Sequence, residues 1–274
     1  MDYTISSDKL RVTVTDAGGT MKSIFYLPEN EERQWQGEEF WKSQDVVIFP
    51  VVGHAGAFDV NGQTYRLHAH GVVRYSVLSL ESQTEDSVTL SLRSNEQTRE
   101  NYPYDFLFKI SYKVVGNSVT VTYFVQSLGG NMPFYVGGHP AMKTPGGEAE
   151  IEFENEESPV LYPIDSAKAV KLSKLKRFIV NKPFFKECKT FQLGSLSGGS
   201  IYMHTQDGYT YEYKSNCPLF AFWSKEEGGD YVCVEPWWGI NNFPEAPMEL
   251  TLKPFMNFDN GTGKTFSYTL SIKK

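Results

Sequence analysis

Hydrophobic and polar residues alternate with a period of two along most of the chain. The alternation is clearest in five runs, at residues 10–15, 87–92, 106–113, 118–125 and 266–272. Because successive side chains of a β-strand point to opposite faces of a sheet, each run is typical of a half-buried strand. Such strands at short spacing over the whole length predict an all-β fold, a large antiparallel β-sandwich.

Glycine-containing turn dipeptides separate these runs. Asn61-Gly62 joins two short alternating segments, residues 58–60 and 64–67, in what we expect to be a tight hairpin. Helical periodicity is scarce, and we expect one short helix near Ile164–Lys171 and a 3₁₀ turn within Leu193–Leu196. No repeat, linker or shift in composition marks a boundary, so residues 1–274 are expected to form a single domain.

Composition and charge narrow the classes of function. The chain has 274 residues, 40% hydrophobic and 15% aromatic, which is enough for a substantial core. Its formal net charge of −7 and lack of a basic run make nucleic acid and anionic membranes poor partners. No stretch approaches the roughly 18 apolar residues of a membrane helix. Three cysteines without metal-binding spacing, and no signal-peptide pattern, favour a cytoplasmic protein with reduced thiols.

Three of the five histidines, His54, His68 and His70, lie close together in the chain. On a strand, His68 and His70 would point to one face, which is compatible with a cupin-like metal site. Arg74 argues against that hypothesis, because it would place a cation beside the metal. The alternative is that His70 and Arg74, on one strand face, hydrogen-bond the hydroxyl groups of a neutral polyol.

His139 lies between two glycines and a proline, in Gly137-Gly138-His139-Pro140. The glycines allow close approach of backbone or ligand, and Pro140 ends any ladder pairing. A histidine satisfied at a strand end would need no function. We favour a role in proton transfer, because histidine titrates near pH ~6.5.

Glu235 stands between a β-branched strand and two tryptophans, in Val234-Glu235-Pro236-Trp237-Trp238. It could be a carboxylate at a strand end, capped by backbone N–H groups. The alternative is a general base in a partly apolar pocket, where desolvation raises its pKa above the usual ~4.3. Trp237 and Trp238 would then form one wall of that pocket, on which the apolar face of a sugar could stack. Trp35, Trp41 and Trp223 are available for the same role, although such residues are more often part of a core.

Six short motifs occur in a fixed order along the chain. They are Trp35-Gln36-Gly37 with Trp41, Phe49-Pro50-Val51-Val52-Gly53, His70-Gly71-Val72-Val73-Arg74, Tyr102-Pro103-Tyr104-Asp105-Phe106, Gly137-Gly138-His139-Pro140-Ala141 and Cys233-Val234-Glu235-Pro236-Trp237. This series resembles the aldose 1-epimerase (galactose mutarotase-like) family, in particular its shorter bacterial branch. Each motif alone is weak, whereas six in order, over about residues 10–274, are specific for the family.

The resemblance implies a β-supersandwich fold and the interconversion of the α and β anomers of an aldose, without a cofactor. It assigns the base to Glu235, the acid to His139, and substrate binding to His70 and Arg74. Anomer exchange needs such a pair, because one group removes the C1 hydroxyl proton while another protonates the ring oxygen. The ring opens, the C1–C2 bond rotates, and the ring closes on the other face. The expected partner is a small-molecule sugar, and the expected assembly is a monomer or a homodimer.

Two alternatives on the same fold stay open. A non-catalytic carbohydrate-binding protein would keep the tryptophans and Arg74 but could dispense with the acid–base pair. A hexose-6-phosphate mutarotase would need a second cation beside Arg74, for which Arg66 and Arg99 are the candidates.

The chain also departs from the family pattern. The segment Ile240–Pro244 is unlike its family counterpart, so we expect substrate specificity to diverge there. A second acidic residue of the family has no clear match, and Asp207 and Asp230 are candidates only by residue type.

Overall fold

Strands dominate the computed structural model, which describes residues 1–53, 56–164, 168–241 and 249–274. These residues form 25 strands and two α-helices, and the sheets are built from antiparallel pairs. The predicted all-β sandwich is therefore confirmed. Each of the five alternating runs is a strand with one buried face, as in the pattern of buried and half-buried positions along residues 118–127.

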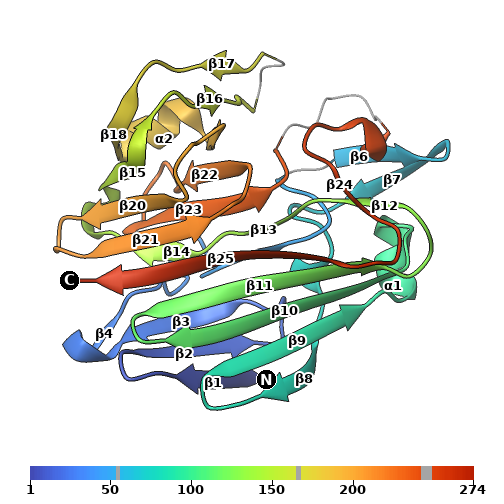
Figure 1. Ribbon diagram of the computed structural model, residues 1–274, viewed down its shortest axis with the longest axis horizontal. Coiled ribbons are helices and arrows are strands. Elements are labelled where there is room, and N and C mark those ends of the chain that lie inside the picture. Colours follow the sequence, from blue (N-terminus) through green and yellow to red (C-terminus); the bar gives the residue numbers. More distant parts are fainter. Residues whose placement is uncertain (54–55, 165–167, 242–248) are drawn as a thin grey trace.

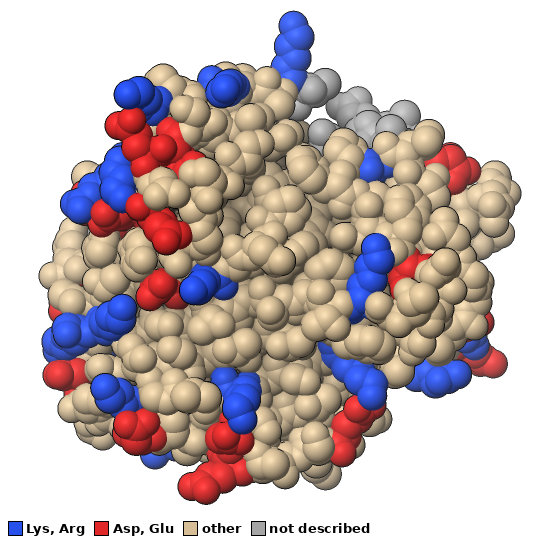
Figure 2. Space-filling model, in the orientation of Figure 1, with Lys and Arg blue, Asp and Glu red and all other residues tan. Residues whose placement is uncertain are grey.

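The largest sheet has nine strands, and its long members run side by side across the middle of Figure 1. Its outward positions carry many serines and threonines, which pair across strands in hydrogen bonds such as Thr120 to Thr269 at 2.9 Å. Figure 2, in the same orientation, shows charged side chains mainly around the rim of this view. In sheet order the strands are β18 (Leu175–Val180), β15 (Ala149–Glu157), β20 (Ser200–Thr205), β21 (Thr210–Ser215), β25 (Lys264–Lys273), β11 (Ser118–Ser127), β10 (Phe106–Val115), β9 (Ser87–Arg93) and β8 (Ser79–Gln83).

An eight-stranded sheet carries most of the residues singled out as functional. Strand β23 is central in it and pairs with β22 on one side and with β13 and β14 on the other. The strands are β17 (Val170–Lys171), β16 (Val160–Leu161), β19 (Phe191–Gly194), β22 (Leu219–Trp223), β23 (Tyr231–Trp238), β13 (Val136–Gly138), β5 (Val47–Ile48) and β14 (Ala141–Lys143).

Smaller elements complete the fold. The predicted hairpin at Asn61-Gly62 is confirmed, and both residues take the positive φ that a tight turn requires (52° and 79°). None of the helices among the described residues is long and apolar enough to cross a membrane. The remaining elements are β1 (Asp2–Ser6), β2 (Leu10–Thr15), β3 (Met21–Tyr26) and β4 (Glu31–Glu32); β6 (Gly56–Val60) with β7 (Gln63–Leu67); β12 (Met132–Phe134) with β24 (Asn257–Asp259); α1 (Glu96–Asn101) and α2 (Lys182–Cys188); and the 3₁₀ turns η1 (Leu27–Glu29), η2 (Val73–Tyr75), η3 (Pro145–Gly147) and η4 (Leu250–Leu252).

Two local predictions are wrong. Leu193 and Gly194 end strand β19 instead of entering a 3₁₀ turn, because they pair with β22. Near Ile164–Lys171 the last two residues form strand β17, and residues 165–167 lie outside the described part of the chain. The α-helices occur elsewhere, and each begins at an asparagine whose side chain accepts a hydrogen bond from a first-turn amide. At six and seven residues they are too short to show a helical hydrophobic period.

Strand β23 divides its side chains between two environments. Val232, Val234 and Trp238 face the main core between the sheets. Cys233 and Trp237, on the other face, belong to two smaller apolar clusters. Glu235 shares their face because side chains alternate along a strand. The expectation that Trp237 and Trp238 form one wall is therefore half wrong, since Trp238 packs on Phe266 and Tyr123 in the core.

Candidate active site

Sheet register places His139 directly opposite Glu235. On strand β23, Trp237 pairs with Gly137 and Cys233 pairs with Ala141. Three residues lie between these pairs on each strand, so continuous antiparallel register puts the middle residues, His139 and Glu235, face to face. Directly opposed residues have Cβ atoms about 5 Å apart, which brings an imidazole and a carboxylate into contact.

Prolines and glycines explain why the ladder opens at this point. Pro140 and Pro236 lack an amide hydrogen, so hydrogen bonding between the strands is interrupted around His139. A Cβ at Gly137 would lie 2.8 Å from the Pro236 carbonyl oxygen, and one at Gly138 would lie 2.8 Å from the Tyr123 hydroxyl. The predicted close approach at the two glycines is confirmed, and the partner is protein backbone and side chain.

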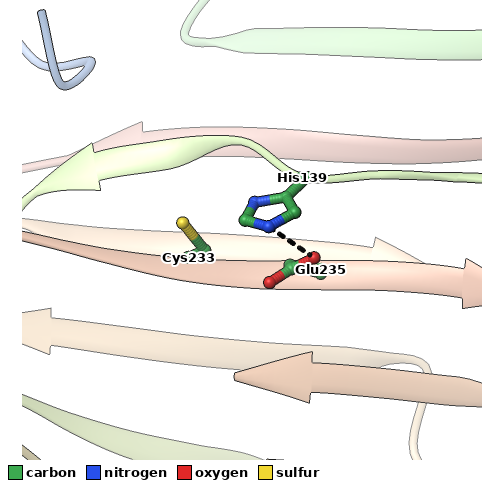
Figure 3. Close-up of side chains that lie close together, drawn as sticks. All are labelled: His139, Cys233 and Glu235. Atoms are coloured by element: carbon green, nitrogen blue, oxygen red, sulfur yellow. Dashed lines mark ion pairs between the residues drawn. The ribbon is translucent and has the colours of Figure 1, made fainter. Parts of the chain in front are cut away.

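The two side chains form a buried pair without a full hydrogen bond. His139 Nε2 lies 3.3 Å from Glu235 Oε2 (Figure 3). Glu235 is 0% exposed and His139 is 6% exposed. Within the described residues, neither carboxylate oxygen of Glu235 has a hydrogen-bond partner, and neither does His139 Nδ1. The alternative of a carboxylate capped by backbone N–H groups is therefore wrong for this geometry. Orphaned polar atoms at such depth are costly, which points to a functional role.

Burial shifts the two pKa values in opposite directions. It raises the pKa of Glu235 well above 4.5; the charge of Asp45 adds to this, while the nearby Trp237 indole, which lacks hydrogen-bond geometry, opposes it. Burial also lowers the pKa of His139 well below 6.5, and the neighbouring His70 and Arg74 act the same way. A low-dielectric site disfavours the charged form of each group. Between the two pKa values the pair therefore holds one proton.

Aromatic rings hold the imidazole of His139 in place. Trp41 stacks on it with ring centroids 5.1 Å apart, and Trp223 meets it edge-on at 5.4 Å. His70 contacts it from another side at 5.3 Å. Trp41 and Trp223 thus belong to the site, whereas Trp35 lies behind them against Tyr231.

His70 lies in a tight loop, so the prediction that His68 and His70 share a strand is wrong. Strand β7 ends at Leu67, and His70 has a φ of 67°, which is rare outside glycine. Its backbone is fixed by hydrogen bonds with Phe49 and Gly53. The Gly53 amide also donates to His70 Nδ1 at 3.3 Å, so the ring proton of a neutral His70 sits on Nε2.

Arg74 lies in the 3₁₀ turn η2, not on a strand shared with His70. Its Nη2 donates to the Ser43 hydroxyl at 3.2 Å. No carboxylate among the described residues forms an ion pair with it, so its charge is available to a ligand. The turn nevertheless directs Arg74 to the cavity that His70 lines.

These residues surround one cavity of about 320 Å³, at the small end of ligand pockets. All five residues proposed from the sequence, Glu235, His139, His70, Arg74 and Trp237, line it. The described lining also includes Trp41, Gly53, Ala69, Thr190, Trp223 and Asn241.

Sequence reasoning missed Thr190 and did not assign a role to Asn241. The Gln192 side chain forms two hydrogen bonds with the Asn241 backbone. Its Oε1 accepts from the Asn241 amide at 2.9 Å, and its Nε2 donates to the Asn241 carbonyl at 3.1 Å. The sequence contains little indication of this contact, because a glutamine that is buried and hydrogen-bonded, such as Gln192, cannot be told from an exposed one until its partners are known. Asn241 belongs to the segment Ile240–Pro244, where specificity is expected to diverge, and residues 242–248 lie outside the described part of the chain.

The metal hypothesis finds no support at its expected place. Residue 54 lies outside the described residues, and the His68 ring packs against Tyr75, away from the cavity that His70 lines. A different trio, His139, Cys233 and Glu235, places one donor atom from each residue within 4.8 Å of the others (Figure 3). These three could accept a cation, although two of them are also the acid–base candidates.

The two aspartates considered as a second acidic residue lie in another cavity. Asp207 and Asp230 line a space of about 480 Å³ together with Arg33 and Lys143. Arg33 pairs there with Asp207 at 2.9 Å and with Glu31 at 3.0 Å. Neither aspartate contacts the cavity of Glu235 and His139.

The cations considered for a phosphate also lie elsewhere. Arg99 pairs with Asp105 at 2.6 Å, and Arg66 is exposed on strand β7. Arg74 is the one cationic side chain in the described lining of the 320 Å³ cavity.

Comparison with known proteins agrees with this fold. The chain belongs to the aldose 1-epimerase family, whose model matches residues 1–251. Protein LacX (chromosomal) of Lactococcus lactis subsp. lactis is 25% identical over 284 residues, 93% of each chain. A galactose mutarotase related enzyme from Lactobacillus acidophilus has a TM-score of 0.93 at 26% identity and covers 100% of this chain and 98% of its own. Family and fold together support a sugar epimerase or mutarotase.

A second solved structure bears on the fold alone. The galactose mutarotase-like protein from Lactobacillus casei has a TM-score of 0.93 at 18% identity, over 100% of both chains. The supersandwich is thus kept at low sequence identity, which makes the residues of the cavity the basis for any statement about chemistry.

Proposed function

We propose that this chain is an aldose mutarotase that interconverts the α and β anomers of an unphosphorylated hexose or a closely related sugar, without a cofactor. One observation carries the proposal: a carboxylate and an imidazole face each other, buried and unsatisfied, in an aromatic-walled cavity. Glu235 is the base and His139 is the acid. Each group contributes a factor of roughly 10²–10⁴ to the rate.

The single proton of the pair fits the reaction. Ring opening needs one proton acceptor near the C1 hydroxyl and one donor near the ring oxygen, and ring closure needs the reverse. A bound sugar supplies the hydrogen-bond donor that Glu235 lacks, which favours its ionised form. The proton then resides on His139, ready for the ring oxygen. No net proton enters or leaves, so the same pair serves both directions.

The remaining residues would hold the sugar in place. His70 Nε2–H, Arg74 and Asn241 can hydrogen-bond sugar hydroxyls, since each offers N–H donors. Trp41, Trp223 and Trp237 offer ring faces and edges to the apolar C–H surface of a pyranose. Holding the anomeric centre between Glu235 and His139 is itself a large part of catalysis.

The charge of the cavity favours an unphosphorylated substrate. Arg74 is the one cation in the described lining, and Glu235 stands in the same wall. A phosphate carries a charge of about −1.5 to −2 and is usually held by several cationic or backbone donors. A hexose 6-phosphate is therefore the weaker candidate.

Anomer exchange measured by NMR tests the proposal. Freshly dissolved α-glucose, α-galactose, a pentose and glucose 6-phosphate would each be followed with and without the protein. At least one unphosphorylated sugar should equilibrate faster than in buffer, and the phosphorylated sugar should gain least. Heat-denatured protein is the control. If no sugar in the panel equilibrates faster than buffer, the proposed activity is wrong.

A further inference from the structure

A second carboxylate lies buried directly behind the candidate active site. Asp45 is 5% exposed, and its Oδ2 accepts a hydrogen bond from the Met21 amide at 3.2 Å. Strand β5 pairs Val47 with Gly138, and the Ala141 amide donates to Gln44 at 3.1 Å. The same register places Asp45 opposite Pro140, next to His139.

Asp45 approaches His139 from the core side of the sheet. Val47 belongs to the main core, whereas Val46 belongs to the smaller cluster that contains Trp237. Because side chains alternate, Asp45 shares the face of Val47 and points between the two sheets. The backbone amides of Val46 and His139 lie near enough to favour its charged form, although neither forms a full hydrogen bond with it.

Four buried tyrosines lie close enough to Asp45, on the core side, for its charge to act on them. Tyr213 and Tyr268 are fully buried, and their hydroxyls lack a partner among the described residues. A Cβ at Gly138 would lie 2.9 Å from the Tyr268 hydroxyl, so the absent side chain makes room for it. The tyrosines come from four neighbouring strands of the nine-stranded sheet: Tyr213 (β21), Tyr268 (β25), Tyr123 (β11) and Tyr112 (β10).

Asp45 and the four tyrosines form a buried polar patch, and burying it lowers the stability of the fold. Asp45 Oδ1 has no hydrogen-bond partner in the described structure, nor do the two tyrosine hydroxyls. An apolar residue at position 45 would avoid the cost of burying a carboxyl group. Unsatisfied polar atoms thus lie on both faces of the strand pair that carries His139 and Glu235. Their concentration at one place argues for a function of the patch.

We propose that Asp45 is a positioning residue of the candidate active site, whose negative charge beside the His139 main chain keeps the shared proton on the Glu235–His139 pair. The proposal rests on the proposed function, because it concerns the same pair. Asp45 touches no substrate, since it lies behind the sheet. Its negative charge acts through the strand and favours the protonated forms of both groups.

The surroundings of Asp45 define what else could contribute. Its charge raises the pKa of Glu235. It acts the same way on Cys233 and on the four tyrosines, none of which ionises near neutral pH. The groups that face Asp45 are therefore Glu235 and Cys233 from β23, His139 from the β13–β14 connection, Tyr112, Tyr123, Tyr213 and Tyr268, and the amides of Met21 and Val46.

Asp45→Asn tests the proposal because it removes the charge and nearly keeps the shape. The pH profile of kcat for anomer exchange should shift, with its alkaline limb moving to lower pH by on the order of one unit. The ¹⁵N imidazole titration of His139, assigned with His139→Asn, should move in the same direction. Unchanged midpoints in a folded Asp45→Asn protein would overturn the proposal.

Tyr268→Phe is the matched control. It removes an unsatisfied hydroxyl from the same patch but no charge, so the pH profile and the His139 titration should stay in place. An equal shift in Tyr268→Phe and Asp45→Asn would mean that packing, not the charge of Asp45, sets the midpoints, and the proposal would fail.

Wild-type protein supplies the measurement that does not depend on a folded variant. With ¹³C-labelled aspartate, the Asp45 carboxyl should titrate near pH 6, and His139 should show an inflection at the same pH. A carboxyl that does not titrate between about pH 4 and pH 8 contradicts the proposal. If wild-type protein does not accelerate anomer exchange, the proposed function is wrong. If wild type is active but the pH profile of Asp45→Asn is unchanged, only the role of Asp45 is wrong.

Discussion

Two cavities of this molecule differ in size and in how their charges are paired. The larger, about 480 Å³, holds Arg33 in ion pairs with Asp207 and Glu31. The smaller, about 320 Å³, holds Glu235 with both carboxylate oxygens unpartnered, beside a buried imidazole. Arg33 also stacks over Tyr209 at 3.6 Å, so its charge is already satisfied by the protein.

This comparison shows that the volume of a cavity does not identify the active site. The buried cation of the larger cavity, Arg33, is paired within the protein and leaves little for a ligand, whereas the orphaned groups in the smaller cavity gain partners only when something binds. Perturbed groups of this kind cluster at functional sites. If the contrast is correct, substitutions in the small cavity change activity, and those in the large cavity change mainly stability.

The largest effect is expected for Glu235→Gln. The amide cannot accept the C1 proton, so kcat for anomer exchange should fall by roughly 10²–10⁴-fold. Sugar binding, followed by calorimetry, should stay within a few-fold of wild type. If the variant exchanges anomers as fast as wild type, Glu235 is not the base. If neither protein exceeds the rate in buffer while the sugar still binds, the chain is a carbohydrate-binding protein without catalysis.

Asp45→Asn should change stability with a definite dependence on pH. Burial raises the pKa of Asp45 from 3.8 to about 6, so the stabilising contribution of its protonated form is lost as pH rises through about 6. Above that pH the variant should be the more stable protein, by at most about 3 kcal/mol. The gap should close towards pH 4. Urea unfolding at several pH values measures this difference in unfolding free energy between the two proteins. A difference that grows in acid would contradict the raised pKa of Asp45.

Arg74→Met should reduce kcat/KM by roughly 10- to 100-fold, because a hydrogen bond to a charged group contributes about 1.5–3 kcal/mol. Arg74 binds sugar hydroxyls in the proposed complex but moves no proton, so KM should carry most of the loss. Arg99→Gln removes a cation that pairs with Asp105 outside both cavities and serves as the control. Equal losses in the two variants would argue against a role for Arg74.

The smallest effect on activity is expected for Asp207→Asn in the larger cavity. The substitution weakens the ion pair to Arg33 but leaves Glu31 in place, so unfolding free energy should fall by about 1 kcal/mol. Anomer exchange should remain within about two-fold of wild type, a change below 0.5 kcal/mol in the barrier. If Asp207→Asn lowered kcat/KM as much as Arg74→Met, the larger cavity would also serve activity, and the contrast between the two cavities would be wrong.

Sequence alone predicted the strands and most of the candidate site. Alternation identifies a strand wherever one face is buried, as for residues 118–127. The short helices were missed because their start depends on capping by Asn95 and Asn181, a local hydrogen bond without a hydrophobic period. The predicted strand carrying His68 and His70 failed because long-range backbone bonds to Phe49 and Gly53 impose a loop.

The sequence could not show that Glu235 and His139 meet, nor how deeply the site residues are buried. Glu235 and His139 meet through the register of β13, β14 and β23, and register depends on pairings between distant segments. The two prolines were a usable signal, since each lies next to one member of the pair. Asp45 gave no signal, because nothing near it in the chain distinguishes a buried carboxylate from an exposed one.

The central claim is that Glu235 and His139 act as one acid–base unit. The most direct test compares kcat for anomer exchange in Glu235→Gln, His139→Asn and the double variant. If the two groups serve the same ring-opening step, the double variant should be little slower than the slower single variant, because removing one partner already disables the unit. Losses that multiply would contradict the account, since they would mean that the two residues act independently.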